Sequence, residues 1–407
     1  MNCHFVARLL ACTVLSSVAF TPALASDIER VDGPGGKSVI AGAISADGSV
    51  VVGTINPSQN PSSVDGRGFR WTPATAMRVF AEPGPFSRFT ATGVSNDGGY
   101  FVGSATADML EQNASAGAAR AYRWSASGGF KDLGSLSAGA ESRGKAISGD
   151  GKVVVGSSGG TYSMTGFRWE EGSGMQALPG NFADQHPMAT SYDGSVVIGT
   201  RTYPDIKAIR WKKGVGTDVL PLFREDTSSW AYDVSDDGAV IVGWTDVQAV
   251  RWTDAGIFSL GHLGDRANAF SVAYGVSGNG EVIVGMAGNG SAVHDPYRGF
   301  RWTEGAGMQT VEDWLRASGA VIASDMTYLA RSTNCDGSIV VGETGIVHGL
   351  VGTPPSALFI ARGTGTGRND CRSAGGNSGG GNAGGGNSGG EDPGGETSGG
   401  QNGGGQN

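Results

Sequence analysis

A short hairpin sequence recurs along nearly the whole chain. An Asp-Gly or Asn-Gly pair is followed by an apolar strand that ends in glycine, such as SVVVG after Gly48. The pair occurs at seven places, 42 to 57 residues apart: Asp47-Gly48, Asp97-Gly98, Asp150-Gly151, Asp193-Gly194, Asp237-Gly238, Asn279-Gly280 and Asp336-Gly337. One copy is too small to bury a core of its own, so the chain must fold as stacked repeats.

A second motif follows the hairpin in each copy. Six copies carry an Arg-Trp strand, such as GFRWT from Gly68 to Thr72, and the seventh has SALFIAR from Ser356 to Arg362. A short strand such as GMQAL follows most of them. The Asp-Gly pair predicts a two-residue type I′ turn, and alternation places Arg on one face with Phe and Trp on the other. Repetition in every copy indicates that Arg and Trp serve packing rather than ligand binding.

Four short strands in a unit of 40–50 residues are typical of a β-propeller. We predict an all-β propeller of about seven four-stranded blades, with six or eight as alternatives. The last copy lacks a fourth strand, while Asp27–Val31 has no partner in the first copy. The N-terminal strand is therefore predicted to close the last blade and remove its free edge. The helical spacing of TVEDWLRASG predicts a short helix within 310–319.

The N-terminus has the pattern of a secretory signal peptide. Arg8 precedes the apolar stretch Leu9–Phe20, and Ala23-Leu24-Ala25 predicts cleavage before Ser26. Residues 1–25 are thus a signal peptide, residues 26–372 the propeller, and residues 373–407 a disordered Gly/Asn/Ser-rich tail. We expect export to the periplasm, the cell surface or the medium.

Two cysteines remain after the signal peptide is removed, Cys335 and Cys371. In an oxidising compartment such a pair favours a disulfide, here one that clamps the closing blade. Two separate thiols are the alternative. The net charge of −9 and the absence of a long Lys/Arg run exclude nucleic acid as a partner. No apolar run predicts a transmembrane helix, no Cys/His spacing predicts a metal site, and no motif indicates a cofactor.

Taken together, the signal peptide, the VSxDGxVVVG hairpins and the AFRWT-like strands resemble the HAF family of bacterial extracellular repeats. The resemblance covers Val39 to Arg362, although Gly-Phe, Ala-Tyr, Ala-Ile or Ala-Val replaces the family's His-Ala-Phe triplet. It implies a surface protein similar to autotransporter passengers, with the tail as a linker toward the outer membrane. It implies no particular chemistry.

Residues that break the repeat are the candidate site. Trp230, Tyr232 and Trp244 replace small or polar residues on one blade and form a possible platform for a glycan or peptide; filling the local core is the alternative. The other residues that depart from the repeat are Trp314, Tyr162, Tyr203, His186, His262, His294 and Asp295.

Three functions remain open. The favoured one is a non-enzymatic binding or adhesion module for a glycan, matrix or protein partner. The second is a polysaccharide hydrolase or lyase that uses carboxylates such as Glu141, Asp184 or Glu225, and no catalytic set is identified for it. The third is a structural envelope protein.

Overall fold

The computed structural model describes residues 26–56, 66–80, 88–106, 119–160, 163–180, 185–246, 248–264, 269–288, 297–345 and 356–367. The predicted signal peptide and tail lie outside the described residues. The structure is all-β apart from a 3₁₀ turn, η1 (Pro34–Gly36), and one helix, α1 (Val311–Ala317). No helix in these ranges is long and apolar enough to cross a membrane.

Strands follow one another in antiparallel groups of four, as predicted, and we call each group a blade, named by its first strand. The β2 blade contains β2 (Ser38–Ile44), β3 (Val51–Asn56), β4 (Arg67–Thr72) and β5 (Ala76–Val79). The β6 blade contains β6 (Arg88–Val94), β7 (Tyr100–Thr106), β8 (Arg120–Ser125) and β9 (Gly129–Asp132). The β10 blade contains β10 (Glu141–Ile147), β11 (Val153–Gly160), β12 (Ser163–Glu170) and β13 (Gly174–Ala177). A single parallel bridge between Arg67 and Phe89 joins the β2 and β6 blades into one eight-stranded sheet.

The remaining blades are separate four-stranded sheets. The β14 and β18 blades contain β14 (Gln185–Thr190), β15 (Val196–Arg201), β16 (Lys207–Lys212) and β17 (Gly216–Val219), and β18 (Ser229–Val234), β19 (Ile241–Thr245), β20 (Gln248–Thr253) and β21 (Gly256–Ser259). The β22 blade contains β22 (Phe270–Val276), β23 (Ile283–Gly288), β24 (Arg298–Thr303) and β25 (Gly307–Thr310). The β26 blade contains β26 (Thr327–Thr333), β27 (Ile339–Thr344) and β28 (Ala357–Arg362), together with β1 (Asp27–Val31).

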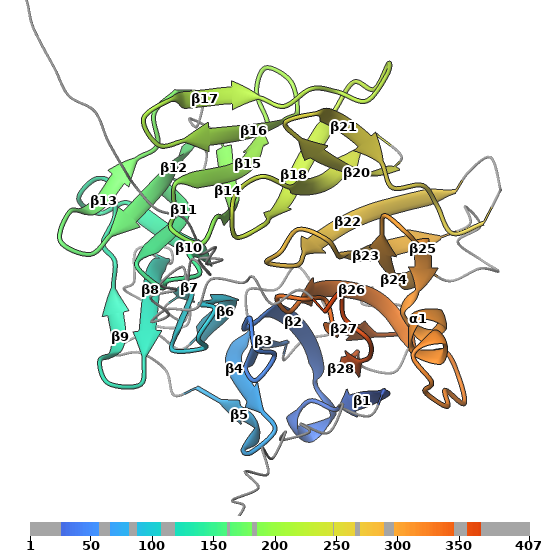
Figure 1. Cartoon of the computed structure of the whole chain (residues 1–407). Helices are drawn as coiled ribbons and strands as arrows, with labels where there is room; N and C mark the ends of the chain where they lie inside the picture. The colour runs from blue at the N-terminus through green and yellow to red at the C-terminus, as the bar shows by residue number, and fades with distance from the viewer. Residues whose placement is uncertain are drawn as a thin grey trace, which may run out of the picture. The chain divides into compact units, whose positions relative to one another are not determined.

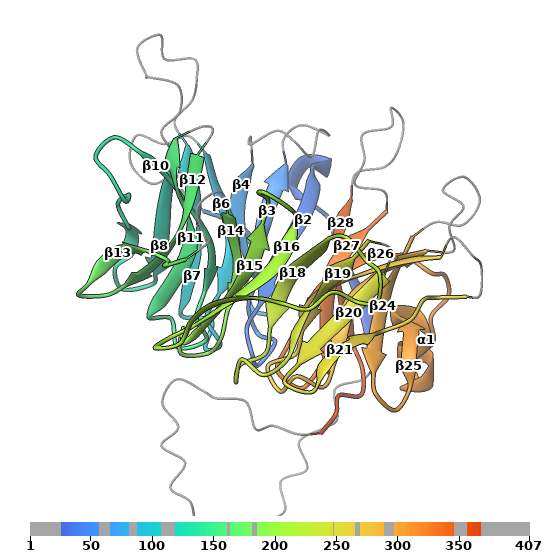
Figure 2. The same ribbon diagram turned by 90° about the horizontal axis from the view of Figure 1, so that it is seen from above.

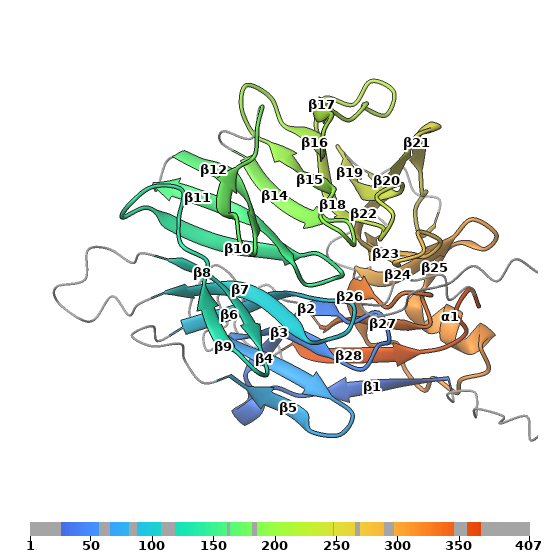
Figure 3. The same cartoon turned by 60° about the vertical axis from the view of Figure 1, so that its left-hand side comes forward.

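The first strands of the blades surround a common centre (Figure 1). Each contacts the first strands of two other blades, in the cycle β2, β6, β10, β14, β18, β22, β26 and back to β2. This arrangement is a β-propeller, as the repeat predicts. β1 pairs with β28 in the register Asp27 to Arg362 (Figure 3), so the prediction that the N-terminal strand completes the last blade is confirmed.

The turns between the first and second strands are joined in a closed cycle of backbone hydrogen bonds, which we call the turn ring. Its seven bonds, 2.9 to 3.2 Å long, run from Ala46 N to Asn96 O, Asn96 N to Gly149 O, Asp150 N to Tyr192 O, Tyr192 N to Asp236 O, Asp236 N to Gly278 O, Asn279 N to Cys335 O and Cys335 N to Ala46 O. Each turn therefore depends on its neighbours, which makes the ring a structural unit.

The turn type predicted from Asp-Gly is wrong. Gly48 has φ +74°, whereas Asp47 is not among the residues with positive φ, and type I′ needs positive φ at both central positions. Gly48 N instead donates to Ser45 O, while the Ser45 hydroxyl accepts the N–H of Val50 and donates to Asp47. The serine two residues before the aspartate thus converts a two-residue turn into a four-residue loop.

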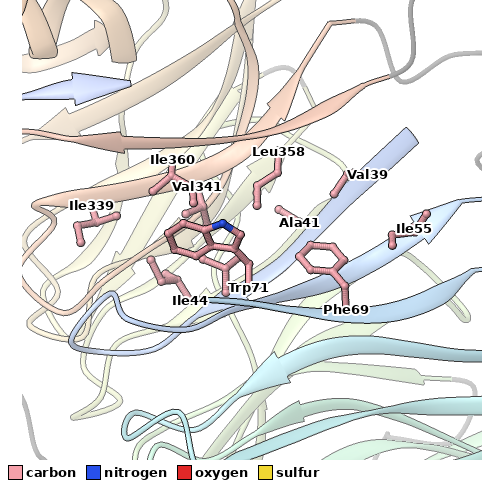
Figure 4. Packing of buried hydrophobic residues seen from close by; sticks show 11 residues of the cluster. Val39, Ala41, Ile44, Ile55, Phe69, Trp71, Ile339, Val341, Leu358 and Ile360 are labelled. Carbon is pink, nitrogen blue, oxygen red and sulfur yellow. The ribbon is translucent and has the colours of Figure 1, made fainter. Parts of the chain in front are cut away.

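Apolar side chains fill the spaces between blades. Phe69 and Trp71 pack with Val39 from their own blade and with Val341 and Leu358 from the β26 blade (Figure 4). Each blade thus completes the core of the next, because one sheet alone cannot cover its own apolar faces.

The Arg-Trp strands connect neighbouring blades. Arg123 lies 4.9 Å above the ring of Trp169 in the next blade, and Arg251 lies 4.8 Å above Trp302. Arg123 also donates to the carbonyl of Gly151, the glycine of the next blade's turn. The arginines thus stabilise contacts between blades, which confirms the packing role that their repetition predicts.

The predicted helix is confirmed as α1, which lies beside β25 (Figure 2). Thr310 caps its N-terminus by accepting the N–H of Asp313, and Trp314 donates from its indole to Thr364 O. Trp314 is buried beneath Arg301, 4.8 Å away, so this candidate residue belongs to the core.

Candidate functional site

The structure divides the three aromatic residues of the predicted platform. Trp230 and Trp244 face each other in the β18–β19 pairing, with ring centres 4.5 Å apart. Tyr232 instead lines a central cavity, and its ring centre lies 5.1 Å from that of Tyr274 in the neighbouring blade. The prediction of one shared platform therefore needs correction: the tryptophan pair and Tyr232 belong to different surroundings.

The tryptophan pair begins a row of aromatic side chains that crosses three blades. The ring centres of Trp244 and Phe270 are 6.0 Å apart, and those of Phe270 and Tyr297 are also 6.0 Å apart. The ring centres of Tyr297 and Tyr328 are 5.9 Å apart. Trp230, Trp244, Phe270 and Tyr297 are half-buried and Tyr328 is buried. Edge-to-face contacts of this kind stabilise the blade interfaces, so the row serves packing in addition to any role in binding.

A cavity of about 210 Å³ lies between the inner strands and the turn ring. Each blade contributes to it through a β-bulge in its first strand. In β18, for example, Ala231 pairs with Gly243 and Asp233 with Val242, so Tyr232 has no partner opposite. The equivalent residues, which we call the bulge positions, are Gly42, Thr92, Lys145, Met188, Tyr232, Tyr274 and Arg331.

All seven bulge positions line the cavity. A bulge leaves its extra residue outside the ladder and redirects its side chain, and bulges occur often beside active sites. The flanking residues are mostly Ala or Gly, whereas the bulge positions range from glycine to tyrosine and arginine. The bulges thus bring chemically different side chains from all the copies together at one cavity.

Two cations line this cavity. Lys145 is exposed to solvent where it lines this open cavity, and desolvation by the nearby protein atoms, followed by the Arg331 charge, lowers its pKa. Arg331 lies 5.3 Å above the ring of Tyr274 and contacts the buried carboxylate of Glu343 at 3.3 Å. Burial raises the pKa of Glu343 even though Arg331 and the N–H of Ala41 favour its charged form.

Two carboxylates also line the cavity. Asp233 accepts the N–H groups of Val276 at 3.0 Å and Val234 at 2.9 Å, yet burial raises its pKa to about 7. Asp236 belongs to the turn ring, and Asn96, 140 residues away in sequence, donates to it at 2.9 Å. This hydrogen bond between distant turns crosses one end of the cavity.

Burial also affects the cavity tyrosines. It raises the pKa of Tyr232 to about 12 and that of Tyr274 in the same direction. Both phenols therefore stay protonated at neutral pH and can donate hydrogen bonds.

The other candidates that the structure describes lie apart from the cavity. Tyr203 is 75% exposed, His186 is exposed and His262 approaches the hydroxyl of Ser271 at 3.4 Å. Glu141 pairs with Arg143, and neither Glu141 nor Glu225 lines the cavity. Tyr162, Asp184, His294 and Asp295 lie outside the described residues.

Among the residues that the structure describes, no group of His, Cys, Asp and Glu could hold a metal ion. Cys335 is buried and disulfide-bonded. Its predicted partner Cys371 lies outside the described residues, so the pairing stays a prediction.

Sequence reasoning missed Lys145, Tyr274 and Arg331. The repeat itself marks these residues. Each stands three residues before the serine or asparagine that precedes the turn, which is Ser148, Ser277 or Asn334. Aligning the copies on that residue would have placed all three at one equivalent position of the repeat.

No family model matches the sequence, and no curated protein matches it. Among solved structures, the chain is similar to TolB from Acinetobacter baumannii, with 11% identity, a TM-score of 0.42 and 63% of this chain covering 62% of the other. A protein described as TolB from Agrobacterium tumefaciens has 13% identity and a TM-score of 0.41 over 81% of this chain and 91% of its own. The β-propeller domain of Cps50 (Swd1) from Myceliophteria thermophila has 10% identity and a TM-score of 0.48 over 83% of this chain and 100% of its own.

Proposed function

We propose that the chain is an exported, seven-bladed β-propeller that binds a glycan, matrix or protein partner without catalysing a reaction. A small part of this partner enters the central cavity. The number of blades is supported by the seven four-stranded groups and by the seven hydrogen bonds of the turn ring. Export is supported by the signal-peptide pattern of residues 1–25.

One observation carries the binding function. The bulge positions converge on one cavity, and their side chains range from glycine to tyrosine, lysine and arginine. A purely structural ring would be served by the same small residue in every blade. Ligand pockets typically combine aromatic surface with a few convergent polar groups, and Tyr232, Tyr274, Lys145 and Arg331 provide both.

Binding can be tested by probing glycan and matrix-protein arrays with the purified full chain. Thr92→Trp places an indole at a small bulge position and fills the cavity, so we expect capture to be lost. Met188→Trp fills the cavity from another blade and serves as a second variant. Thermal unfolding identifies variants that retain the fold, and capture by a folded cavity-filling variant would show that the cavity is not the site.

The tryptophan pair remains a second contact for an extended glycan. Trp230→Ala and Trp244→Ala are matched variants for this contact, because neither residue lines the cavity. We expect both to retain capture, with reduced affinity where the partner extends beyond the cavity. Complete loss of capture in these variants, with full capture by Thr92→Trp, would favour the platform over the cavity.

Export is tested separately by N-terminal sequencing of the protein from cell fractions. We expect a mature chain beginning at Ser26 in the periplasm, at the surface or in the medium. Association with the surface through residues 373–407 predicts that deleting this tail releases the protein into the medium. Unprocessed protein in the cytoplasm would contradict export.

A further inference from the structure

The ammonium group of Lys145 is the cavity's most available charge. The side chain enters from the bulge of β10 and lines the cavity. It forms no hydrogen bond or ion pair with any residue that the structure describes. The ammonium is accessible in the cavity and has no counter-charge there, so it can pair with a bound anion.

Arg331 presents a second cation from another blade. Glu343 is its hydrogen-bond partner, at 3.3 Å, and the Arg331 Nε is buried with no partner among the described residues. The guanidinium carbon also lies 5.3 Å from the centre of the Tyr274 ring. Arg331 lines the cavity, and its guanidinium carries more N–H donors than Glu343 uses, as is suited to recognising a carboxylate or phosphate.

The two carboxylates that line the cavity accept hydrogen bonds from other groups of the protein. Both oxygens of Asp233 accept backbone N–H groups, from Val234 and Val276. Asp236 accepts from Asn96 across the turn ring. These carboxylates are thus already held by donors of the protein itself.

The pKa of Lys145 agrees with this geometry. Desolvation is the largest cause of the lowered pKa of Lys145, and the positive charge of Arg331 is the second. No carboxylate contributes in the opposite direction. The two cations thus act on each other across the cavity. Placing an anion between them replaces repulsion with two attractions.

We propose that the cavity binds a small oxyanion, and specifically a carboxylate of monosaccharide size or smaller, between Lys145 and Arg331. This inference rests on the proposed function and names its ligand class. The rings of Tyr232 and Tyr274 lie against the body of the ligand, and their protonated hydroxyls donate hydrogen bonds to it. The volume of about 210 Å³ lies below the range of drug-sized pockets, which limits the ligand to such a size.

Isothermal titration of the full chain with three probes tests the inference. D-Galacturonate carries a carboxylate, D-galactose is its neutral counterpart, and inorganic phosphate supplies an oxyanion without a sugar. We expect galacturonate to bind at least tenfold more tightly than galactose, with affinity falling as salt increases. Phosphate binding without galacturonate binding would identify a phosphate as the source of the same oxyanion chemistry.

Lys145→Met removes the charge and keeps a chain of similar length. We expect it to weaken galacturonate binding about tenfold or more and to leave any galactose binding unchanged. Lys37→Met is the matched control, because Lys37 is exposed and does not line the cavity. Arg331→Gln should weaken binding as well, and thermal unfolding checks its fold because Glu343 loses its cationic partner.

The outcomes separate this inference from the proposed function. Equal binding of galactose and galacturonate that is unaffected by Lys145→Met would overturn the oxyanion site, while loss of that binding in Thr92→Trp would still support a binding cavity. Absence of binding for all three probes would also overturn the oxyanion site. In that case the arrays with the cavity-filling variants decide the proposed function independently.

Discussion

The glycines of the turns and the bulge positions lie only a few residues apart along the chain, yet the glycines are the same in every copy and the bulge positions are not. Every turn carries a glycine at positive φ and a hydrogen bond to the next turn. The bulge positions share their backbone geometry but carry side chains from glycine to arginine. In a ring of copies, the features that repeat hold the ring together, and the features that vary are available for recognition. Substitutions in the two regions should therefore have opposite effects on stability and binding.

The largest effect is expected in the turn ring. Gly337 has φ +70°, and a Cβ there would lie 2.2 Å from Val282 Cγ2 of the neighbouring blade. Gly337→Ala combines left-handed strain with overpacking, so the free energy of unfolding should fall by about 3 kcal/mol. Urea unfolding followed by tryptophan fluorescence measures it.

Gly214→Ala is the matched control. Gly214 has φ +77° but no atom within 4 Å of the added Cβ, so only the backbone strain of about 1 kcal/mol applies. Equal losses in the two variants would show that contact between neighbouring turns contributes little.

An intermediate effect is expected at Asp233, because burial raises its pKa from the ordinary value of 3.8 to about 7 in the folded state. Between about pH 4 and pH 7 the unfolded chain has released this proton while the folded chain still holds it. As the pH rises from about 4 to about 7, the free energy of unfolding of the wild type should therefore fall relative to that of Asp233→Asn. Above pH 7 the difference between the two proteins should stay constant.

The size of this change follows from the pKa difference. A shift of this size corresponds to about 4 kcal/mol, and accessible surface in the cavity reduces it to about 2 kcal/mol. Unfolding at a series of pH values measures the difference, since other groups titrate alike in both proteins. Parallel stability curves for the two proteins would contradict the raised pKa.

The smallest effect on stability is expected for Lys145→Met. The ammonium has no partner among the described residues and acts against Arg331, so removing its charge should leave stability within about 0.5 kcal/mol of wild type or raise it slightly. The same variant has the largest expected effect on oxyanion binding. A loss of more than 1 kcal/mol in thermal or urea unfolding would mean that Lys145 is a structural residue.

The fold could be predicted in detail because its determinants are local and repeated. The Val-rich strands, the Arg-Trp strands and the glycine turns each recur, so an error in one copy is corrected by the others. The pairing of β1 with β28 could also be predicted, because the last copy lacks a fourth strand and the N-terminal strand has no partner in the first copy. The turn type did not follow, because it depends on side-chain hydrogen bonds of Ser45 and Asp47 rather than on the dipeptide alone.

The site was predicted only in part, for a geometric reason. In a regular strand, Trp230 and Tyr232 would lie on the same face, because side chains alternate with a period of two. The bulge at Tyr232 breaks that alternation and turns the tyrosine into the cavity. Lys145 and Arg331 were missed because a charged residue in a strand ordinarily indicates a solvated face, and their inward position depends on bulges in two separate blades.

The pairing of β1 with β28 has a consequence for how the domain unfolds. A linear repeat array frays from its ends, where the terminal units have one neighbour each. Here the two ends of the described chain share a single sheet, and every blade is held on both sides. Partial loss of one blade exposes two apolar faces at once, so melting should be sharply cooperative rather than progressive along the array.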